Sequence, residues 1–75
     1  MDLNSSFEFN LYQATMSRNN AKAAISYWQS VEEVWLDRDN EQMLQEIRSI
    51  IEEEIQNFQH FSKEIERLQL LSPFV

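Results

Sequence analysis

The side chains that could do chemistry in this chain of 75 residues are few. His60 and Glu64 stand four residues apart, so on a helix they would share one face, where they could hold a metal ion or exchange a proton. The chain has no second histidine, and a surface histidine beside a carboxylate is the simpler interpretation. The run Glu52–Glu54 supplies three carboxylates, but consecutive helix positions point in different directions and make no catalytic pair.

Cysteine and glycine are both absent from the sequence. Without cysteine there are no disulfides and no thiolate metal ligands, and no serine stands in a nucleophile motif. Phosphate-binding loops are rich in glycine, so the sequence offers no such loop. The composition therefore predicts a protein that is not an enzyme and that uses no cofactor and no metal.

The chain is acidic, with 13 acidic and 6 basic residues and a net charge of −7. Nucleic-acid binding and attachment to an anionic membrane both need a basic surface, so neither is expected here. The sequence shows no leader of the secretory type and no apolar run of the length that a membrane span needs. Together with the lack of cysteine, these features predict a cytoplasmic protein.

An apolar stripe between Asn40 and Leu71 is the element on which the rest of the chain depends. Its members recur at alternating steps of three and four residues, the spacing of a helix packed along another helix. Glu54 interrupts the series: either Ile55 takes its place, which we expect, or Glu54 pairs with Lys22 and sets the register. The stripe consists of Leu44, Ile47, Ile51, Phe58, Phe61, Ile65 and Leu68.

The first half of the chain also has a helical pattern, and a polar run separates the two halves. We expect a helix over about residues 6–36, with Ser5 or Ser6 as its cap. A turn over residues 37–40 should follow, and then a second helix over about residues 41–71. Two arms of nearly equal length about a central turn predict an all-α fold, a single-domain antiparallel helical hairpin of the coiled-coil type.

Four local features refine this prediction. Asn40 should cap the second helix, and Pro73 forbids its continuation. The stretch Ser17–Asn20 is the weakest part of the first arm, so a kink or break there is an equal alternative, which would allow a compact three-helix monomer. The C-terminal tail, residues 72–75, is expected to fold back over the end of the helices; the alternative is that it docks on a partner as a short extended peptide.

Apolar residues exceed what one contact between two helices can cover, because aromatic residues alone make up 12% of the chain. The favoured solution is that two hairpins pair into a four-helix bundle, which makes the protein a homodimer. A partner helix lying in the remaining groove is the alternative. In either case, exposed tryptophan and tyrosine side chains are the expected centres of binding.

Negative charge is concentrated around the turn. Between Glu32 and Glu54 there are nine acidic and two basic residues, which accounts for the whole net charge of −7. The electrostatic field of these acidic residues favours encounter with a basic partner, although surface charge also serves simply to keep a protein soluble. We predict that the chain binds a protein partner as an adaptor, inhibitor or small chaperone. The candidate partner-binding residues are Tyr27, Glu32, Glu33, Trp35, Asp37, Glu41 and Glu46.

Two other functions are compatible with the sequence. Carboxylates around the turn could imitate phosphates, which would make the chain a nucleic-acid mimic that inhibits a DNA- or RNA-binding protein. The chain could also be a structural subunit of a larger assembly. Excess DNA should displace the target of a mimic, whereas the partner of an adaptor need not respond to it.

A short segment of the first arm resembles a known family. Met16-Ser17-Arg18 followed by Ala21, after an aromatic stretch, looks like the helix start of NblA. The proteins of that family are small, helical and dimeric, and they target phycobilisomes for degradation. The hairpin architecture is also similar to the small co-chaperones of type III secretion needle proteins. Both resemblances imply a small helical protein that acts by binding other proteins.

Overall fold

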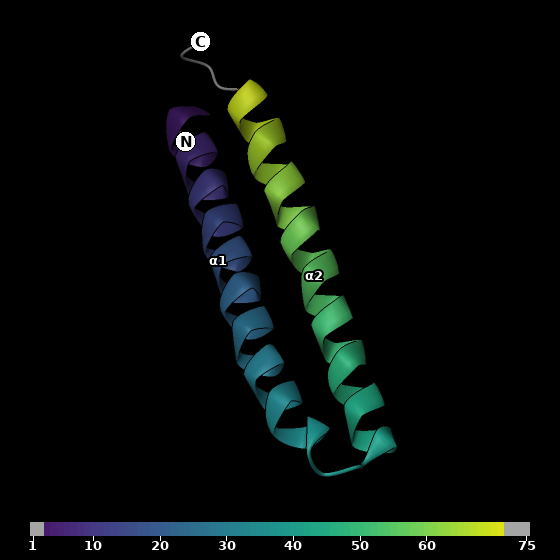
Figure 1. Cartoon of the computed structure of the whole chain (residues 1–75). Helices are drawn as coiled ribbons and strands as arrows, with labels where there is room; N and C mark the ends of the chain where they lie inside the picture. Colours follow the sequence, from purple (N-terminus) through teal and green to yellow (C-terminus); the bar gives the residue numbers. More distant parts are fainter. Residues whose placement is uncertain (1–2, 72–75) are drawn as a thin grey trace.

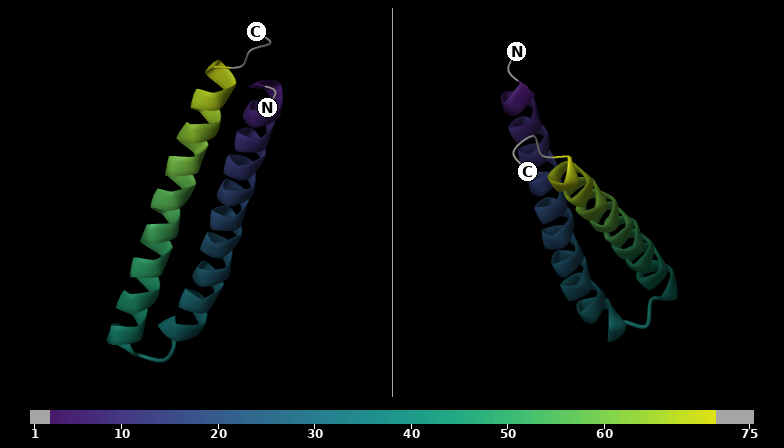
Figure 2. Two further views of the ribbon diagram at one scale, coloured as in Figure 1. Left: turned by 180° about the vertical axis from the view of Figure 1, so that it is seen from behind. Right: turned by 90° about the horizontal axis from the view of Figure 1, so that it is seen from above.

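In the computed structural model, two long antiparallel helices lie side by side and form a hairpin (Figure 1). The structure describes residues 3–71, and it describes side chains from residue 6 onward. Helix α1 spans Leu3–Leu36 and helix α2 spans Glu41–Leu70, in a body of 55 × 17 × 14 Å. The all-α hairpin is confirmed, and residues 3–71 contain no strand and no third helix (Figure 2).

The turn between the helices has the predicted position and cap. Asp39 adopts a left-handed backbone with φ of 55°, which aspartate tolerates because its short side chain can hydrogen-bond locally. The Asn40 side chain then accepts a hydrogen bond from the Met43 N–H, with the two atoms 3.1 Å apart. This bond satisfies an amide that has no partner inside the helix, and so it fixes the start of α2.

Removal of the Asn40 cap should destabilise the hairpin measurably. For Asn40→Ala we expect the free energy of unfolding to fall by about 1 kcal/mol, because a first-turn amide of α2 loses its acceptor. Asn40→Ser keeps an oxygen in the same place and should retain most of that stability. Urea unfolding followed by circular dichroism measures both variants. An equal loss in the two variants would show that the side-chain acceptor is not what stabilises the start of α2.

Helix α1 runs without interruption through residues 17–20, so the break considered for this stretch does not occur. Serine and asparagine lower helix stability by no more than about 0.7 kcal/mol per residue. The turns on either side carry Ala14 and Ala21, which are both buried in the hairpin. Their packing outweighs the weak local preference, as it does for most helices in folded proteins.

The outer ends of the two helices lie close to their predicted positions. Helix α1 already begins at Leu3, so Ser5 and Ser6 lie inside the helix and the prediction that one of them caps it is wrong. Helix α2 ends at Leu70, and the N–H of Leu71 still donates to the Arg67 carbonyl at 3.1 Å. The predicted fold-back of the tail concerns residues 72–75, which lie outside the described residues.

The core is the seam, the line of contact between the two helices. Helix α2 supplies its large side chains, of which Ile47 is the most buried at 2% exposure. Helix α1 supplies small ones, which lets the two backbones approach closely. Phe7 and Leu11 pack against one end of the seam. The buried apolar side chains of the described residues are Ala14, Ala21, Leu44, Ile47, Ile51, Ile65 and Leu68.

The prediction that Ile55 replaces Glu54 in the seam is wrong. Glu54 is half-buried, whereas Ile55 is 38% exposed. The three-and-four spacing of the stripe therefore continues through residue 54, as in a coiled coil, instead of drifting by one position. The alternative pairing does not form either, because Lys22 is exposed and makes no ion pair with Glu54.

A glutamate at a seam position interrupts the apolar contact between the helices. Glu54→Leu should therefore raise the free energy of unfolding by about 1 kcal/mol, since part of a leucine side chain would leave water. Glu53→Leu makes the same chemical change at an exposed neighbour and should change stability little. Urea unfolding of both variants tests the register. A larger gain from residue 53 than from residue 54 would contradict the register seen in the structure.

Candidate functional site

The seven predicted partner-binding residues do not form one surface. Tyr27 is 62% exposed, but by helical spacing it lies on the side of α1 opposite Ala14 and Ala21, and so faces away from α2. Its ring packs edge-on against Trp28, with the centroids 5.2 Å apart. The residues that do gather around the turn, all of them exposed, are Glu33, Asp37, Glu41 and Glu46.

Trp35 is less accessible than the sequence suggested. It is half-buried, and the guanidinium carbon of Arg38 lies 5.1 Å from its ring centroid, within the range of a cation–π contact. The backbone N–H of Arg38 also donates to the Trp35 carbonyl at 3.1 Å, which closes the first part of the turn after α1. Trp35 therefore helps to hold the turn, and only part of its ring can reach a partner.

Glu32 is engaged inside the hairpin. Its carboxylate accepts a hydrogen bond from the Arg48 guanidinium across the two helices, with Nε and Oε2 2.8 Å apart. Such a surface ion pair contributes about 0–1 kcal/mol to stability. It also neutralises Glu32, which leaves this residue a weaker candidate for partner binding than its neighbours. The sequence did not indicate the pair, because it becomes visible only once the register of the helices is known.

The acidic end, which we define as Glu33, Asp37, Asp39, Glu41 and Glu46, is the charged surface of the hairpin. These five side chains are exposed, and within residues 6–71 none of them makes an ion pair. A shallow hollow lies at the same end, lined by Asn40, Gln42, Met43 and Glu46. This arrangement offers carboxylates and side-chain amides to a partner, which suits basic and hydrogen-bonding groups.

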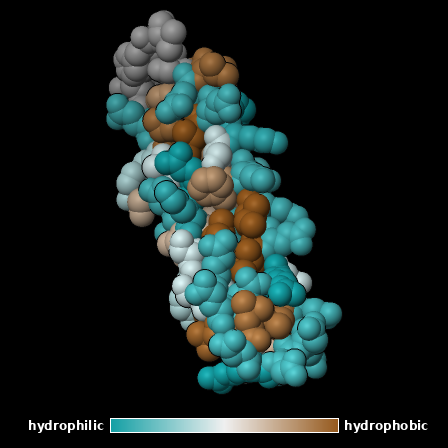
Figure 3. Space-filling view, viewed as in Figure 1, coloured by the Kyte–Doolittle hydropathy of each residue, from teal (hydrophilic) through white to brown (hydrophobic). Residues whose placement is uncertain are grey.

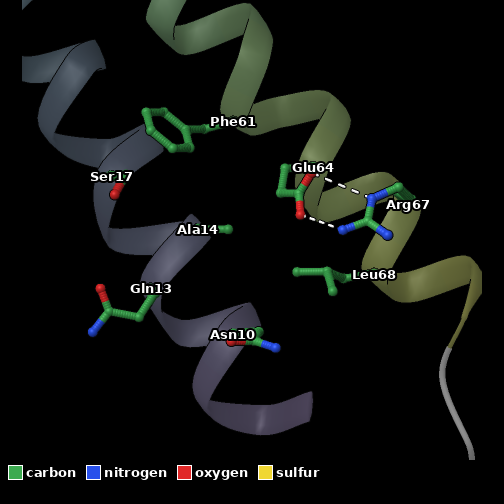
Figure 4. A pocket seen from close by; sticks show the side chains of 8 residues that line it. All are labelled: Asn10, Gln13, Ala14, Ser17, Phe61, Glu64, Arg67 and Leu68. Carbon is green, nitrogen blue, oxygen red and sulfur yellow. Dashed lines mark hydrogen bonds and ion pairs between the residues drawn. The ribbon is translucent and has the colours of Figure 1, made fainter. Parts of the chain in front are cut away.

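A cleft of about 320 Å³ lies near the opposite end of the hairpin (Figure 4). Glu64 and Arg67 of α2 face each other there and are hydrogen-bonded, while α1 lines the other side with Asn10, Gln13 and Ser17. The Arg67 guanidinium lowers the pKa of the Glu64 carboxyl, and Glu64 in turn raises the pKa of Arg67. The two charges are therefore satisfied by each other.

His60 does not pair with Glu64, although the two were considered as a metal or proton site. The His60 ring packs edge-on against Phe61, with the centroids 5.1 Å apart, and it is exposed. Glu64 is bonded to Arg67 instead. Within the described part of the chain, no group of three or more histidine, aspartate or glutamate side chains is placed to hold a metal ion.

The outer stripe is an apolar line along the side of α1 that faces away from α2. We define it as the positions from Phe9 to Val34 that recur at steps of three or four residues. Its large side chains stay between 44% and 62% exposed, except that Val31 is half-buried. The outer stripe comprises Phe9, Tyr12, Met16, Asn20, Ala23, Tyr27, Val31 and Val34.

Apolar groups also reach the surface elsewhere on the hairpin. Figure 3 shows them, in brown, in a line between the two helices and again near the turn, among charged and polar side chains. Leu36 at the end of α1 and Leu70 at the end of α2 are exposed as well.

Neither helix, within residues 3–71, is long and apolar enough to cross a membrane.

Comparison with known proteins gives no relative. The resemblance of Met16-Ser17-Arg18 and Ala21 to NblA is confined to a short segment of α1. No family model matches the chain, and neither a curated protein nor a solved structure matches it.

Proposed function

We propose that this chain is a non-enzymatic protein that acts by binding other proteins, as an adaptor, inhibitor or small chaperone. The observation that carries the proposal is the outer stripe, where Phe9, Tyr12, Met16, Tyr27 and Val34 are all exposed. Contiguous apolar surface on a soluble protein is typical of a binding interface. Tyrosine in particular is enriched among the side chains that dominate binding energy.

The balance of buried and exposed side chains supports the same conclusion. Within the described residues, seven apolar side chains are buried, and only one of them, Ile47, is almost fully enclosed. Nine large apolar side chains are exposed over the same part of the chain. A domain of this size has a small hydrophobic core and therefore a low stability of its own. A partner that covers the exposed side chains of the folded chain raises its stability by mass action.

The acidic end is the second surface in this proposal. Its carboxylates lie around the turn at one tip of the hairpin, and they are free of ion pairs within residues 6–71. A partner with a basic patch would be steered to this tip, and the rate of association would fall as salt rises. We therefore assign the acidic end to the binding of a basic protein.

Capture from lysates of the source cells tests this assignment, with the full-length tagged chain as bait. The test variant combines Glu33→Gln, Asp37→Asn, Glu41→Gln and Glu46→Gln. The matched control combines Glu8→Gln, Glu52→Gln, Glu53→Gln and Glu66→Gln, which changes the net charge equally at exposed positions away from the turn.

We expect the wild type and the control to retain the same basic protein, and the test variant to lose about tenfold or more in affinity for it. Equal retention by all three baits would contradict the assignment of the acidic end. Release of the partner by excess DNA would instead favour a mimic of nucleic acid.

A further inference from the structure

The outer stripe has the spacing of a second helix-packing surface. Its positions occupy about a third of the circumference of α1, on the side away from Ala14 and Ala21. Helix α1 thus carries two apolar faces, one already packed against α2 and one exposed. A helix that is apolar on two sides is typical of a position between two neighbours, so α1 has room for a second helical partner.

No charge interrupts the outer stripe. The four charged residues of α1 beyond Phe9 all project from the remaining part of the circumference, between the outer stripe and α2 or toward α2. Burial of the outer stripe would therefore remove no unpaired charge from water. Burying an unpaired charge is the most costly kind of burial. Those four residues are Arg18, Lys22, Glu32 and Glu33.

The spacing of the outer stripe is the same in both directions along the helix. Its steps from Phe9 to Val34 are three, four, four, three, four, four and three, so its centre falls between residues 21 and 22. A copy laid antiparallel across that centre brings every member of one stripe opposite a member of the other. The pairs formed are Phe9 with Val34, Tyr12 with Val31, Met16 with Tyr27, and Asn20 with Ala23.

We propose that the outer stripe binds the outer stripe of a second copy of this chain, antiparallel, about a two-fold axis that passes between residues 21 and 22. A two-fold interface requires a surface that complements itself, and this spacing supplies one. Ala23 lets the helices approach near the axis, and Asn20 beside it is a polar position that fixes the register. The inference rests on the proposed function, in which the outer stripe is a protein-binding surface. It assigns that surface to a second copy of the chain and leaves the acidic end for other proteins.

The distribution of charge selects the antiparallel arrangement. The stretch 32–54 carries the whole net charge of −7, whereas the remaining residues hold four acidic and four basic side chains and are neutral. Parallel pairing would place two acidic ends side by side and raise their mutual repulsion. Antiparallel pairing places the acidic end of each copy beside the neutral end of the other.

The area available reaches what a reversible dimer needs. Each of the five large exposed side chains of the outer stripe leaves on the order of 100 Å² uncovered. Two copies together would bury about 1,000 Å², which is the minimum expected of a biological interface and is typical of a pair that dissociates on dilution. In the dimer the two α1 helices form the centre and the two α2 helices lie outside, so the acidic ends stay open at opposite tips for other proteins.

Cross-linking tests the pairing, because the native chain has no cysteine. Single cysteines are introduced as Ala23→Cys, Val34→Cys and Phe9→Cys, and each purified full-length protein is treated with a short bis-maleimide. In the proposed dimer, Ala23→Cys lies near the axis and links to its own copy. Two copies of Val34→Cys would be about 38 Å apart along the helix and should not link. When the Phe9→Cys and Val34→Cys proteins are mixed, the cysteine of one should be cross-linked to the cysteine of the other.

Each other outcome overturns the proposal. Self-linking of Val34→Cys without linking to Phe9→Cys would show a parallel pair. Absence of every link, with the helical circular dichroism of the native chain retained, would show that a second copy does not occupy the outer stripe. If the wild type then still captured another protein through this face, the proposed function would stand and only the partner would change.

A charge placed in the outer stripe gives a second, independent test. Tyr27→Glu would bury two like charges in the proposed interface, so the dissociation constant of the dimer should rise about 30-fold or more. Ser26→Glu adds the same charge at the adjacent exposed position, which lies off the outer stripe, and should change it less than about threefold. Equal effects of the two substitutions on sedimentation equilibrium would overturn the proposal.

Discussion

Replacing Ile47 with alanine should lower the free energy of unfolding by about 2–5 kcal/mol. Ile47 is 2% exposed and lies in the part of the seam nearest the turn. Its truncation would leave a cavity that α1 cannot fill, because long helices relax only partly around a lost side chain. Small domains have total stabilities of about 5–15 kcal/mol or less, so the loss should be visible as a large drop in melting temperature.

Ile55→Ala is the matched control, since it removes the same atoms from the same helix at a side chain that is 38% exposed. Its cost should stay below about 1 kcal/mol. Urea unfolding at one fixed protein concentration compares the two variants, because binding of a second copy would make stability depend on concentration. A larger loss for residue 55 than for residue 47 would mean that the seam runs along a different face of α2.

Replacing Asn20 with proline should destabilise the hairpin by about 3 kcal/mol or more. Asn20 lies in the middle of α1, where proline removes a backbone hydrogen bond and clashes with the preceding turn. The substitution also interrupts the helix between Ala14 and Ala21, so both could no longer pack against α2 together. Circular dichroism should show a loss of helix as well as lower resistance to urea.

Asn20→Ala, at the same exposed position, is expected to have the opposite effect on stability. Alanine is the better helix former, so this variant should keep or slightly raise the stability of the hairpin. The comparison separates helix continuity from loss of the asparagine side chain itself. If proline were tolerated as well as alanine, the chain would have a natural break at residues 17–20, and a single continuous α1 would be refuted.

The sequence predicts the architecture well where one strong pattern decides it. The stripe on α2 identifies the helix and the face that it turns to α1. Two of its seven members, Phe58 and Phe61, are half-buried, and the other five are buried: Leu44, Ile47, Ile51, Ile65 and Leu68. Asn40 and the polar residues before it locate the turn, because their side chains favour caps over helix interiors. At these positions the local preference for a helix or a turn agrees with the packing of α1 against α2. The hairpin can therefore be predicted from the local pattern.

Prediction from sequence fails where packing and local preference disagree. Residues 17–20 are weak helix formers, yet they stay helical because buried alanines on both sides hold α1 against α2. Glu54 occupies the seam position that the sequence analysis assigned to its apolar neighbour Ile55. In both cases the register of the two helices determines which residues are buried. The register depends on how the helices pack against each other, and the local sequence of either helix does not specify it.

The candidate site shows the same division. The exposed carboxylates around the turn were found from charge alone, and they lie together at one tip. Glu32 and Trp35 were predicted to be available as well, but Arg48 bonds the first and Arg38 covers part of the second. The outer stripe was present in the sequence as separate aromatic positions, and it becomes one surface only when α2 is seen to occupy the opposite side of α1.

The mass of the full chain in solution, measured by sedimentation equilibrium over a range of concentrations, tests the outer stripe as a binding surface most directly. We predict twice the 9.0 kDa of one chain, with dissociation on dilution and a lower mass for Tyr27→Glu at the same concentration. A mass of 9.0 kDa at every concentration, in a sample that circular dichroism shows to be fully helical, would contradict the antiparallel dimer.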